Sequence, residues 1–501
     1  MGRSGTGSDP RMHLGGPFEG YVVLGFDEAF EAQSGGLRPR PHYRPVVEAF
    51  SRYAPDVLAR LAQTIDLLLR EQGITFTLLG HGEGLERTLP LDPFPRVVPA
   101  SEWRRLEAGL VQRVRALNAF VHDVYHEARI LEAGVVPRDV VYTSSQYRRE
   151  VRGITPPGGV YVHIAGIDLV RDEDGTYYVL EDNVRVPSGV SYVLENRTIL
   201  AAVLPHLLRS LPVRPVRDYP DRLVSLLRTL VEVDDPRVVV LTPGVYNSAY
   251  FEHAFLAREM GIDLVEGRDL VVEDEAVYLR TLRGLERVDV IYRRIDDEFL
   301  DPLVFRSDSL LGVPGLFFAY RRGRVAIANA IGTGIADDKA IYPYVPAMIR
   351  FYLGEDPILP NVPTESPEEA APRLRRRPQA YVIKPVDRSG GYGVTLLRLL
   401  PEEERRRAIE VALAEPRRWI VQRLMELSTH PTLCGHHLRP RRVDLRPFVL
   451  TGRAGSWVLP GGLTRVALPE GSYIVNSSQG GGTKDTWVIE ARNPDAPSGR
   501  P

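Results

Sequence analysis

The stretch Ile167-Asp-Leu-Val-Arg-Asp-Glu-Asp-Gly-Thr-Tyr-Tyr-Val-Leu-Glu-Asp-Asn183 decides the fold prediction for this chain. Two alternating runs flank Asp174-Gly175, a dipeptide that favours a two-residue hairpin loop. Counting outward from that loop places Asp168 directly opposite Glu181. Because successive side chains point to opposite faces of a strand, Asn183 shares the face of Glu181. We therefore expect an antiparallel hairpin that carries two carboxylates and one amide on one face.

This face of the hairpin is a candidate magnesium site. Two directly opposed carboxylates repel each other, and a hard cation between them turns that cost into a gain. Magnesium binds one or two carboxylates and completes its shell with water and phosphate. The alternative is a solvated acidic hairpin tip, a description that suits Glu173 and Asp174. The pattern favours a metal site formed by Asp168, Glu181 and Asn183.

A glycine-rich loop follows a second predicted strand. The apolar run from Tyr381 leads to Lys384, and a further apolar run begins at Val394. Glycines allow main-chain N–H groups to approach phosphate oxygens closely, and a neighbouring lysine adds positive charge. The alternative is a plain glycine hairpin. The pattern predicts a phosphate-binding loop whose glycines are Gly390, Gly391 and Gly393.

Lysine is scarce in this chain. Of 63 basic residues only Lys339, Lys384 and Lys484 are lysines. A compact ammonium and a planar guanidinium are not interchangeable at a phosphate, so retained lysines are candidate phosphate ligands. Lys339 follows two glycines at the start of a helix predicted over 336–353, where the helix end favours anions. Lys484 follows three glycines in a loop that could face substrate.

Further polar residues are candidates on weaker grounds. The predicted strand from Trp419 ends in Gln422 and Arg423, where an adenine-binding hinge and an ordinary core strand both remain open. Guanidinium groups suit carboxylates and phosphoryl groups. The arginine candidates are Arg185, Arg293, Arg294 and Arg446. His430, Cys434, His436 and His437 lack a second Cys/His pair at zinc-finger spacing, which disfavours zinc.

Composition narrows the class of protein. The chain has 501 residues and a net charge of −2, which argues against a nucleic-acid partner. No apolar run has the roughly 18 residues of a membrane span. The single cysteine, Cys434, fits a reducing compartment, so we expect a cytoplasmic protein.

The sequence pattern predicts an α/β chain with these parts: a disordered lead-in (1–20), a mainly helical region (21–150), a metal-binding part (151–235), an α/β subdomain on the substrate side (236–300), a helical segment with the first lysine (301–363), a linker (364–378), a strand-rich lobe (379–490) and a disordered tail (491–501). The linker is expected because it is rich in proline and changes from acidic to basic along its length.

Several motifs resemble the circularly permuted ATP-grasp family (type 2), which is distantly related to glutathionylspermidine synthetase. They are Phe26-Asp-Glu-Ala-Phe, Gly73-Ile-Thr-Phe-Thr, Gly158-Gly-Val-Tyr-Val-His-Ile-Ala-Gly-Ile-Asp-Leu-Val, Leu180-Glu-Asp-Asn-Val-Arg-Val-Pro-Ser-Gly-Val-Ser-Tyr, Tyr292-Arg-Arg-Ile-Asp-Asp-Glu-Phe-Leu-Asp-Pro-Leu and Val475-Asn-Ser-Ser-Gln-Gly-Gly-Gly-Thr-Lys-Asp-Thr-Trp. The likeness runs from about Phe26 to Val488. It implies a permuted ATP-grasp fold, in which the metal-binding elements precede the lysine-bearing lobe.

The resemblance also implies site roles. Magnesium is held by Asp168, Glu181 and Asn183, and ATP phosphates contact Lys339 and Lys384 under the glycine loop. Gln422 becomes a better hinge candidate. No amidase domain with a cysteine nucleophile is recognisable in this sequence, and no glutathione- or spermidine-binding element is either.

The expected activity is an ATP-dependent carboxylate–amine ligase that forms an acyl phosphate and releases ADP and phosphate. In that scheme Arg185 and one of Arg293 or Arg294 hold the carboxylate. Ser188, Asn196, Arg446 and Lys484 are candidates for the substrate side. The alternatives are a nucleotide-binding module that acts through a helical partner protein without ligating anything, and a kinase. The sequence identifies neither the acid nor the amine.

Overall fold

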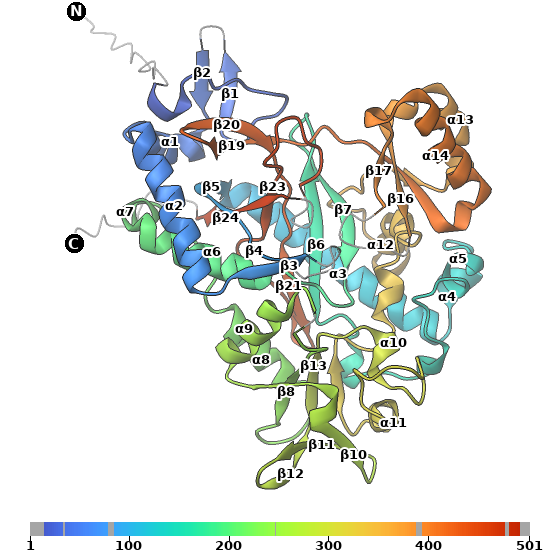
Figure 1. Ribbon diagram of the computed structural model, residues 1–501. Helices are drawn as coiled ribbons and strands as arrows, with labels where there is room; N and C mark the ends of the chain where they lie inside the picture. The colour runs from blue at the N-terminus through green and yellow to red at the C-terminus, as the bar shows by residue number, and fades with distance from the viewer. Residues whose placement is uncertain are drawn as a thin grey trace, which may run out of the picture.

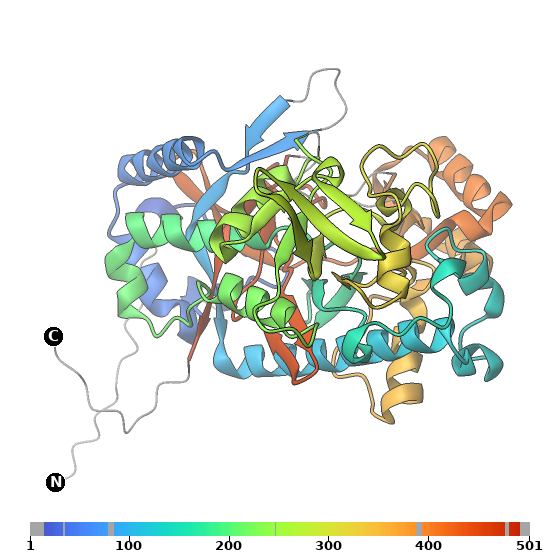
Figure 2. The same ribbon diagram turned by 90° about the horizontal axis from the view of Figure 1, so that it is seen from below.

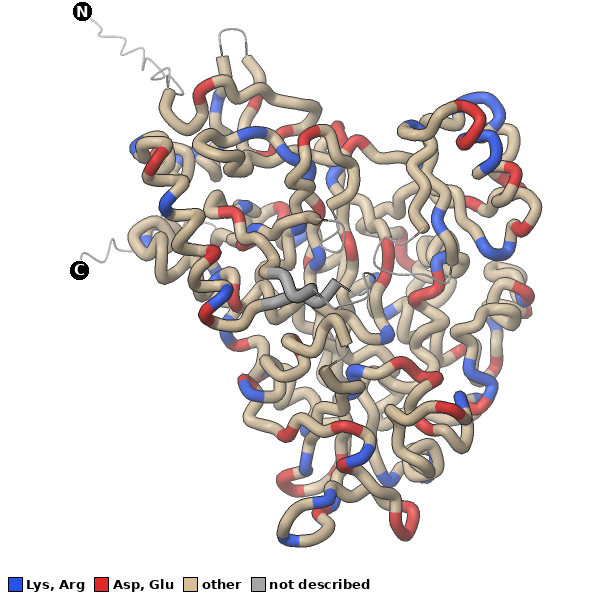
Figure 3. The backbone as a smooth tube through the Cα atoms, in the orientation of Figure 1, with Lys and Arg blue, Asp and Glu red and all other residues tan. Residues whose placement is uncertain are grey.

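The computed structural model describes residues 15–33, 36–78, 85–245, 247–386, 393–475 and 480–490. It is a mixed α/β structure in which a small lobe, orange in Figure 1, stands beside a larger body. Among the described helices none is both long and apolar enough to span a bilayer. Figure 3 shows lysine and arginine positions interspersed with aspartate and glutamate positions along the backbone.

The central sheet of the body has the order β22-β21-β6-β7 and is antiparallel throughout. Its strands are β6 (Ile164–Arg171), β7 (Tyr177–Asn183), β21 (Phe448–Gly452) and β22 (Gly455–Val458). The long helix α3 (Ala100–Tyr125) packs against β21 and β22. Strands from late in the chain thus complete the sheet that begins with the acidic hairpin, and that hairpin lies at the middle of the molecule (Figure 1).

The hairpin β6–β7 has the predicted pairing but not the predicted loop. Asp168 pairs with Glu181 as expected. The two-residue loop is wrong, because Arg171 pairs with Tyr177 and the Asp172 N–H donates to the carbonyl of Thr176 at 3.0 Å. A bulge between Asp168 and Leu169 shifts the register back by one residue. The longer loop and the bulge therefore cancel.

Gly175 turns the hairpin with φ of +81°, a conformation that side chains disfavour. A Cβ atom there would also lie 2.6 Å from the ring of Phe26. That ring is held between the guanidinium groups of Arg40 and Arg171, each 4.4 Å from its centroid. The Phe26 motif thus fastens the N-terminal segment to the tip of the hairpin.

The small lobe has its own sheet and core. The sheet order is β15-β18-β16-β17, with the strands β15 (Thr364–Glu365), β16 (Tyr381–Pro385), β17 (Thr395–Leu396) and β18 (Trp419–Arg423). Helices α13 (Pro367–Arg376) and α14 (Glu402–Ala414) pack on it, and their apolar side chains form a core with Ile383 and Val421.

The predicted linker 364–378 is wrong, since it contains β15 and α13. Ser366 caps α13 by accepting from the Glu369 N–H, and the Glu369 side chain accepts from the Ser366 N–H. Pro367 occupies the first turn, where proline is well tolerated. The buried Ala370 and Leu374 fix the helix to the sheet. Capping and burial outweigh the proline-rich composition that suggested a linker.

The predicted strand-rich lobe 379–490 is not one lobe. After β18 the chain returns to the body and forms β19 (Thr429–Cys434), β20 (His437–Arg442), β23 (Thr464–Val466) and β24 (Gly482–Ile489). The central strand β24 pairs with β23 and, in parallel, with β5 (Leu91–Pro99). The pairing of β24 with β5 joins segments far apart in the chain, so the pattern of residues within each strand does not predict it.

The α/β subdomain is a parallel sheet of order β14-β13-β8-β9, seen nearest the viewer in Figure 2. Its elements are β8 (Val238–Leu241), α9 (Tyr250–Met260), β9 (Asp263–Val265), β10 (Leu270–Glu273), β11 (Ala276–Thr281), β12 (Gly284–Val288), β13 (Val290–Arg293) and β14 (Ala326–Ala328). Because β14 pairs with β13, the unit extends beyond the predicted end at residue 300.

Lys339 does not open a helix. The predicted helix over 336–353 is instead two 3-10 turns, η6 (Thr333–Ala336) and η7 (Tyr342–Tyr344), followed by α12 (Val345–Leu353). Proline at positions 343 and 346 is compatible with the first turns of a short helix and not with the interior of a long one. Lys339 therefore lies in the turn between η6 and η7.

In the described part of 21–150, predicted to be mainly helical, helices predominate and the strands β1 to β5 accompany them. The remaining elements are η1 (Gly16–Phe18), β1 (Phe30–Gln33), β2 (Gly36–Pro39), η2 (Pro41–Tyr43), α1 (Arg44–Ser51), α2 (Pro55–Glu71), β3 (Thr75–Leu78), β4 (Leu85–Thr88), α4 (Arg129–Glu132), α5 (Arg138–Tyr142), η3 (Arg149–Val151), η4 (Pro157–Gly159), α6 (Val190–Val203), α7 (Pro205–Ser210), α8 (Tyr219–Arg228), η5 (Gly267–Asp269), α10 (Asp297–Leu300), α11 (Leu316–Arg321), η8 (Pro378–Ala380), η9 (Leu397–Leu399) and η10 (Pro416–Arg418). Most of the predicted lead-in and the whole tail, 1–14 and 491–501, lie outside the described residues.

Candidate active site

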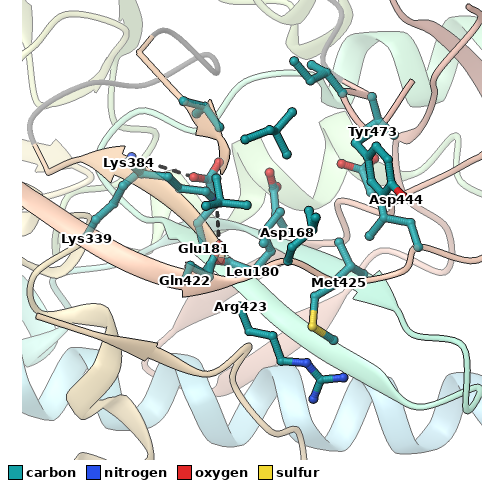
Figure 4. A pocket seen from close by; sticks show the side chains of 18 of the residues that line it. Asp168, Leu180, Glu181, Lys339, Lys384, Gln422, Arg423, Met425, Asp444 and Tyr473 are labelled. Carbon is teal, nitrogen blue, oxygen red and sulfur yellow. Dashed lines mark hydrogen bonds and ion pairs between the residues drawn. The ribbon is translucent and has the colours of Figure 1, made fainter. Parts of the chain in front are cut away.

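A cleft between the central sheet and the small lobe brings the sequence-predicted residues together. The hairpin contributes Asp168 and Glu181, the small lobe contributes Lys384 and Gln422, and Lys339 reaches in from the η6–η7 turn. Figure 4 shows these side chains converging from separate elements. The cleft and its open mouth together contain about 970 Å³ of empty space.

One part of the cleft wall is apolar. Its side chains come from both sheets and from the segments that join the lobes: Val170, Leu180, Val382, Leu396, Met425 and Leu427. Gln422 is buried, and the N–H groups of Arg423 and Leu424 already donate to the carbonyls of Pro363 and Ala380 at 2.9 and 2.8 Å. A flat, apolar ring system fits between these walls better than a charged group does.

Two lysines flank Glu181 in the polar part of the cleft. The ammonium of Lys339 lies 3.8 Å from Glu181 Oε2. Lys384 donates from Nζ to Gln422 Oε1 at 2.6 Å, while Gln422 Nε2 donates to Thr364 Oγ1 at 2.9 Å. The side-chain amide of Gln422 therefore links Lys384 to β15 and fixes the orientation of the lysine ammonium. Two adjacent ammonium groups are suited to an anion with several negative oxygens.

Burial lowers the pKa of Lys384 from its usual 10.5 to about 8, with Lys339 adding to the shift and the carboxylate of Glu181 opposing it. Removing an ammonium from water without a full counter-charge disfavours its protonated form. A bound polyphosphate would supply the missing negative charge. The depressed pKa therefore reflects a buried ammonium whose charge Glu181 offsets only in part.

Asp168 is held by two arginines. Arg446 engages both of its oxygens, with Nη2 at 2.9 Å from Oδ2, and Arg465 Nη2 donates to Oδ2 at 2.6 Å. Burial raises the pKa of Asp168, but Arg446 and Arg465 outweigh it and hold that pKa well below the usual range. Arg465 also binds Asp444 through Nε and Nη2. Asp168 is therefore ionised and fully engaged.

The oxygen donors of the three candidate side chains suit magnesium, but the side chains differ in their availability to a metal. Within the described part of the chain, Glu181 is engaged only by ion pairs of 3.8 and 3.9 Å, to Lys339 and Arg446, and is available as a ligand. The Nδ2 atom of Asn183, on the same strand, is buried without a hydrogen-bond partner. Asp168 can serve only if an arginine releases it. The described residues hold no cluster of three or more His, Cys, Asp or Glu side chains fit for a metal, so two carboxylates and an amide are the whole set.

Arg185 lies beside the cleft rather than in it. It pairs with Asp296 at 3.4 Å and Asp337 at 3.6 Å, and it donates to Gln146 at 3.1 Å. Asp337 in turn accepts from the N–H groups of Val184 and Arg185. Burial raises the pKa of Asp337 to about 6, with Arg185 opposing the shift. Asp337 therefore anchors the chain directly after the metal-candidate strand.

Arg293 and Arg294 are structural in this arrangement. Both are buried, and Arg293 pairs with Asp297 and donates to the carbonyls of Asn329, Ile295 and Ala330. Arg294 pairs with Glu252 at 2.9 Å and donates to Ser188 Oγ at 2.6 Å. Their guanidinium groups are engaged by the protein, so the prediction that one of them holds the substrate carboxylate has no support from the geometry.

Two substrate-side predictions fail for a similar reason. Lys484 lies on β24, not in a loop, and its ammonium is buried against Asp92 and the carbonyl of Pro431 at 2.8 Å. Asn196 is buried on α6 and donates to Thr483 Oγ1 at 3.2 Å. Strand pairing with β5 carries this whole segment into the body. Arg446 does lie at the site, and its Nη1 donates to the carbonyl of Ser188 at 3.1 Å.

The glycine loop is only partly described. Gly393 has φ of +78°, a conformation suited to glycine, and Val394 after it lines the cleft. Gly390 and Gly391 lie outside the described residues.

Sequence reasoning missed Arg465, Asp444 and Asp337. Arg465 is one of 60 arginines, and only its position on β23, beside Asp444 and across from Asp168, distinguishes it.

A two-sheet cleft with paired lysines, facing carboxylates and a glycine loop defines the ATP-grasp class of nucleotide-binding proteins. The sequence agrees: the family described as circularly permuted ATP-grasp type 2 matches residues 95–467. The chain belongs to that family. Membership makes ATP the expected nucleotide.

Relatives extend over most of the chain. An uncharacterized protein of Synechocystis sp. is 49% identical over 93% of this chain and 97% of its own length. An uncharacterized protein of Mycobacterium tuberculosis is 51% identical over 95% of this chain and 87% of its own. A Frankia casuarinae protein, provisionally named a glutamate–cysteine ligase, is 44% identical over 94% of this chain but only 54% of its own length.

A solved structure shares the fold. It is the apo form of a glutathione synthetase-like effector from Globodera pallida, with a TM-score of 0.59 and 11% identity, and the match covers 87% of this chain and 98% of that one. At this identity the likeness concerns the fold alone. The ATP-grasp fold, predicted from the sequence motifs, is confirmed.

Proposed function

We propose that the protein is an ATP-dependent carboxylate–amine ligase that activates an acid as its acyl phosphate and releases ADP and phosphate. The observation that carries the proposal is that Lys339 and Lys384 line, together with Glu181, an interlobe cleft with an apolar wall. The wall suits an adenine ring, and the lysines suit the phosphates that follow it. Membership of the ATP-grasp family and the ligase name of the Frankia relative support the same reaction class.

In this proposal each described residue has a limited task. Lys384, oriented by Gln422, and Lys339 bind phosphate oxygens and offset their charge. Glu181, Asn183 and Asp168 would hold magnesium, which supplies charge neutralisation at the transferring phosphoryl group. Closure of the small lobe over the cleft excludes water, which would otherwise hydrolyse an acyl phosphate. Glutamate and cysteine are not carried over as substrates, because nearly half of the Frankia protein lies outside the match.

The test is phosphate release from ATP by the purified protein, screened against panels of acids and amines with and without hydroxylamine. An acyl phosphate gives a hydroxamate, whereas a kinase product does not. Loss of release in Lys384→Met, with Arg453→Gln as a control on the exposed surface, ties the activity to the cleft. If ATP binds with magnesium but no acid supports release, the alternative of a binding module that acts through a partner protein is favoured. If ATP does not bind at all, the proposal fails.

A further inference from the structure

Arg446 binds the carboxylate group that a metal ion would use as a ligand. Its guanidinium contacts both oxygens of Asp168, and Arg465 donates to one of them as well, so that Asp168 has no solvent exposure. Glu181, the facing carboxylate, is in contrast reached only by ion pairs close to 4 Å. The two paired acids of the hairpin are therefore in different states, one neutralised within the protein and the other still open.

The charged side chains around the cleft have an excess of positive charge even without a bound cation. The charged side chains that line it are three carboxylates, Asp168, Glu181 and Asp444, and four cations, Lys339, Lys384, Arg423 and Arg465. Arg446 adds a further positive charge beside Asp168. A divalent cation that entered alone would add two positive charges to a site that has no excess of negative ones. A nucleotide brings the negative charge that such a cation requires.

We propose that the Arg446–Asp168 ion pair is an internal competitor for divalent cations, which keeps the site closed to metal alone and releases Asp168 only when the cation arrives with a nucleotide. The inference rests on the proposed function, because it takes the hairpin as the metal site of that reaction. It concerns the order of binding and the state of the unliganded protein. These are not implied by the identity of the ligands.

Arg446, rather than Arg465, is the arginine that moves. Arg465 is fastened to the fully buried Asp444 through Nε and Nη2, so its departure would leave a second buried carboxylate unpaired. Among the described residues, the carbonyl of Ser188 is the only other hydrogen-bonded acceptor of Arg446, and Glu181 Oε1 lies 3.9 Å from its Nη2. Its guanidinium can therefore turn away from Asp168 without leaving another buried carboxylate without a counter-ion.

The experiment measures Mn²⁺ binding to the full chain without nucleotide, by the electron paramagnetic resonance signal of free Mn²⁺ or by calorimetry. Wild type is expected to bind Mn²⁺ weakly, and Arg446→Gln about tenfold more tightly or better, since a unit charge at contact distance has at least that effect. Arg442→Gln is the matched control. It removes one positive charge from a residue that stacks on the cleft-lining Tyr473 and pairs with Glu426 rather than Asp168. Its Mn²⁺ affinity should equal that of wild type.

A double variant identifies the carboxylate. Arg446→Gln with Asp168→Asn should lose the gain in affinity, because the freed ligand is gone. The proposal is overturned if Arg446→Gln binds Mn²⁺ no better than wild type, or if the double variant keeps the gain. Should Arg446→Gln fail to fold, Arg446→Lys, which keeps the charge but not the two-pronged contact, must bind Mn²⁺ more tightly than wild type. Binding of ATP with Mn²⁺ to wild type is measured in parallel, and its absence would refute the ligase proposal instead.

Discussion

Lys384 donates a hydrogen bond from its ammonium to Gln422 Oε1 at 2.6 Å, although these residues are 38 positions apart and lie on neighbouring strands of the small lobe. The contact joins two sequence predictions, a phosphate-binding lysine and a hinge glutamine, into one unit. Because Gln422 also donates to Thr364, the lysine is positioned through two neighbouring strands of the sheet. The orientation of this ammonium is thus set before any nucleotide arrives.

The depressed pKa of Lys384 predicts a pH-dependent nucleotide affinity. In the free protein this pKa is about 8, so above pH 8 binding requires uptake of a proton, and affinity for Mg–ATP should fall by up to about tenfold per pH unit. Calorimetry between pH 7 and 9.5 measures this slope. Lys384→Arg keeps its charge over that range and should lose the pH dependence. An equally steep slope in Lys384→Arg would assign the titration to another group.

The same pKa shift has a defined sign for folding. Since the unfolded lysine titrates near 10.4, the unfolded chain binds more protons between about pH 8 and 10.4. The contribution of Lys384 to the free energy of unfolding therefore rises with pH across that window, as its buried charge is lost.

Gln422→Leu should weaken ATP binding without unfolding the small lobe. The change removes the acceptor of Lys384 and the donor to Thr364, and a hydrogen bond to a charged group contributes about 1.5–3 kcal/mol. Fluorescence titration with a labelled ATP analogue measures the loss. Gln112→Leu, a buried glutamine on α3 that binds Glu355 and the carbonyl of Asp356, is the control and should bind ATP normally. Equal losses in both variants would contradict a specific role for Gln422.

The two acids of the hairpin should respond differently to substitution. Glu181→Gln should leave the free energy of unfolding within about 0.5 kcal/mol of wild type, because its ion pairs are long and partly solvated, and should reduce the magnesium dependence of ATP binding. Asp168→Asn leaves Arg446 and Arg465 without their shared counter-ion and should cost about 3–5 kcal/mol of stability. Urea denaturation of both variants measures the contrast. Equal stability would indicate that the arginines find other partners.

Arg294→Met should reduce stability and leave nucleotide affinity unchanged in the folded fraction. The substitution leaves the buried carboxylate of Glu252 without its counter-ion. We expect this to lower the free energy of unfolding by about 3–5 kcal/mol. Adding Glu252→Gln should restore part of the loss, because no buried charge then remains unpaired. Thermal unfolding and ATP titration of the single and double variants provide the measurement. A folded Arg294→Met that binds substrate poorly would reinstate Arg294 as a substrate ligand.

Local chemistry was sufficient for some predictions that depend on neighbours in the chain. The strand that delivers Lys384 and the pairing of Asp168 with Glu181 both follow from alternation, turn residues and spacing. The predicted pairing of Asp168 with Glu181 is correct although the predicted loop is one residue too short, because the bulge between Asp168 and Leu169 offsets the difference. The prediction of a linker is wrong because Ser366 and Glu369 form a capping box that starts a helix there. This pair can be recognised in the sequence.

The sequence by itself determined the family and the acidic hairpin, because both are encoded by residues within short segments. Only the tertiary structure decided which charges meet. Lys484, Arg293 and Arg294 are buried with partners from distant strands and helices, whereas Arg465 reaches Asp168 across the body. Arginine and lysine side chains are long, and the free energy of burying their charge depends on partners that chain spacing does not specify. The state of the metal-candidate carboxylate, held by Arg446, is for that reason a property of the fold.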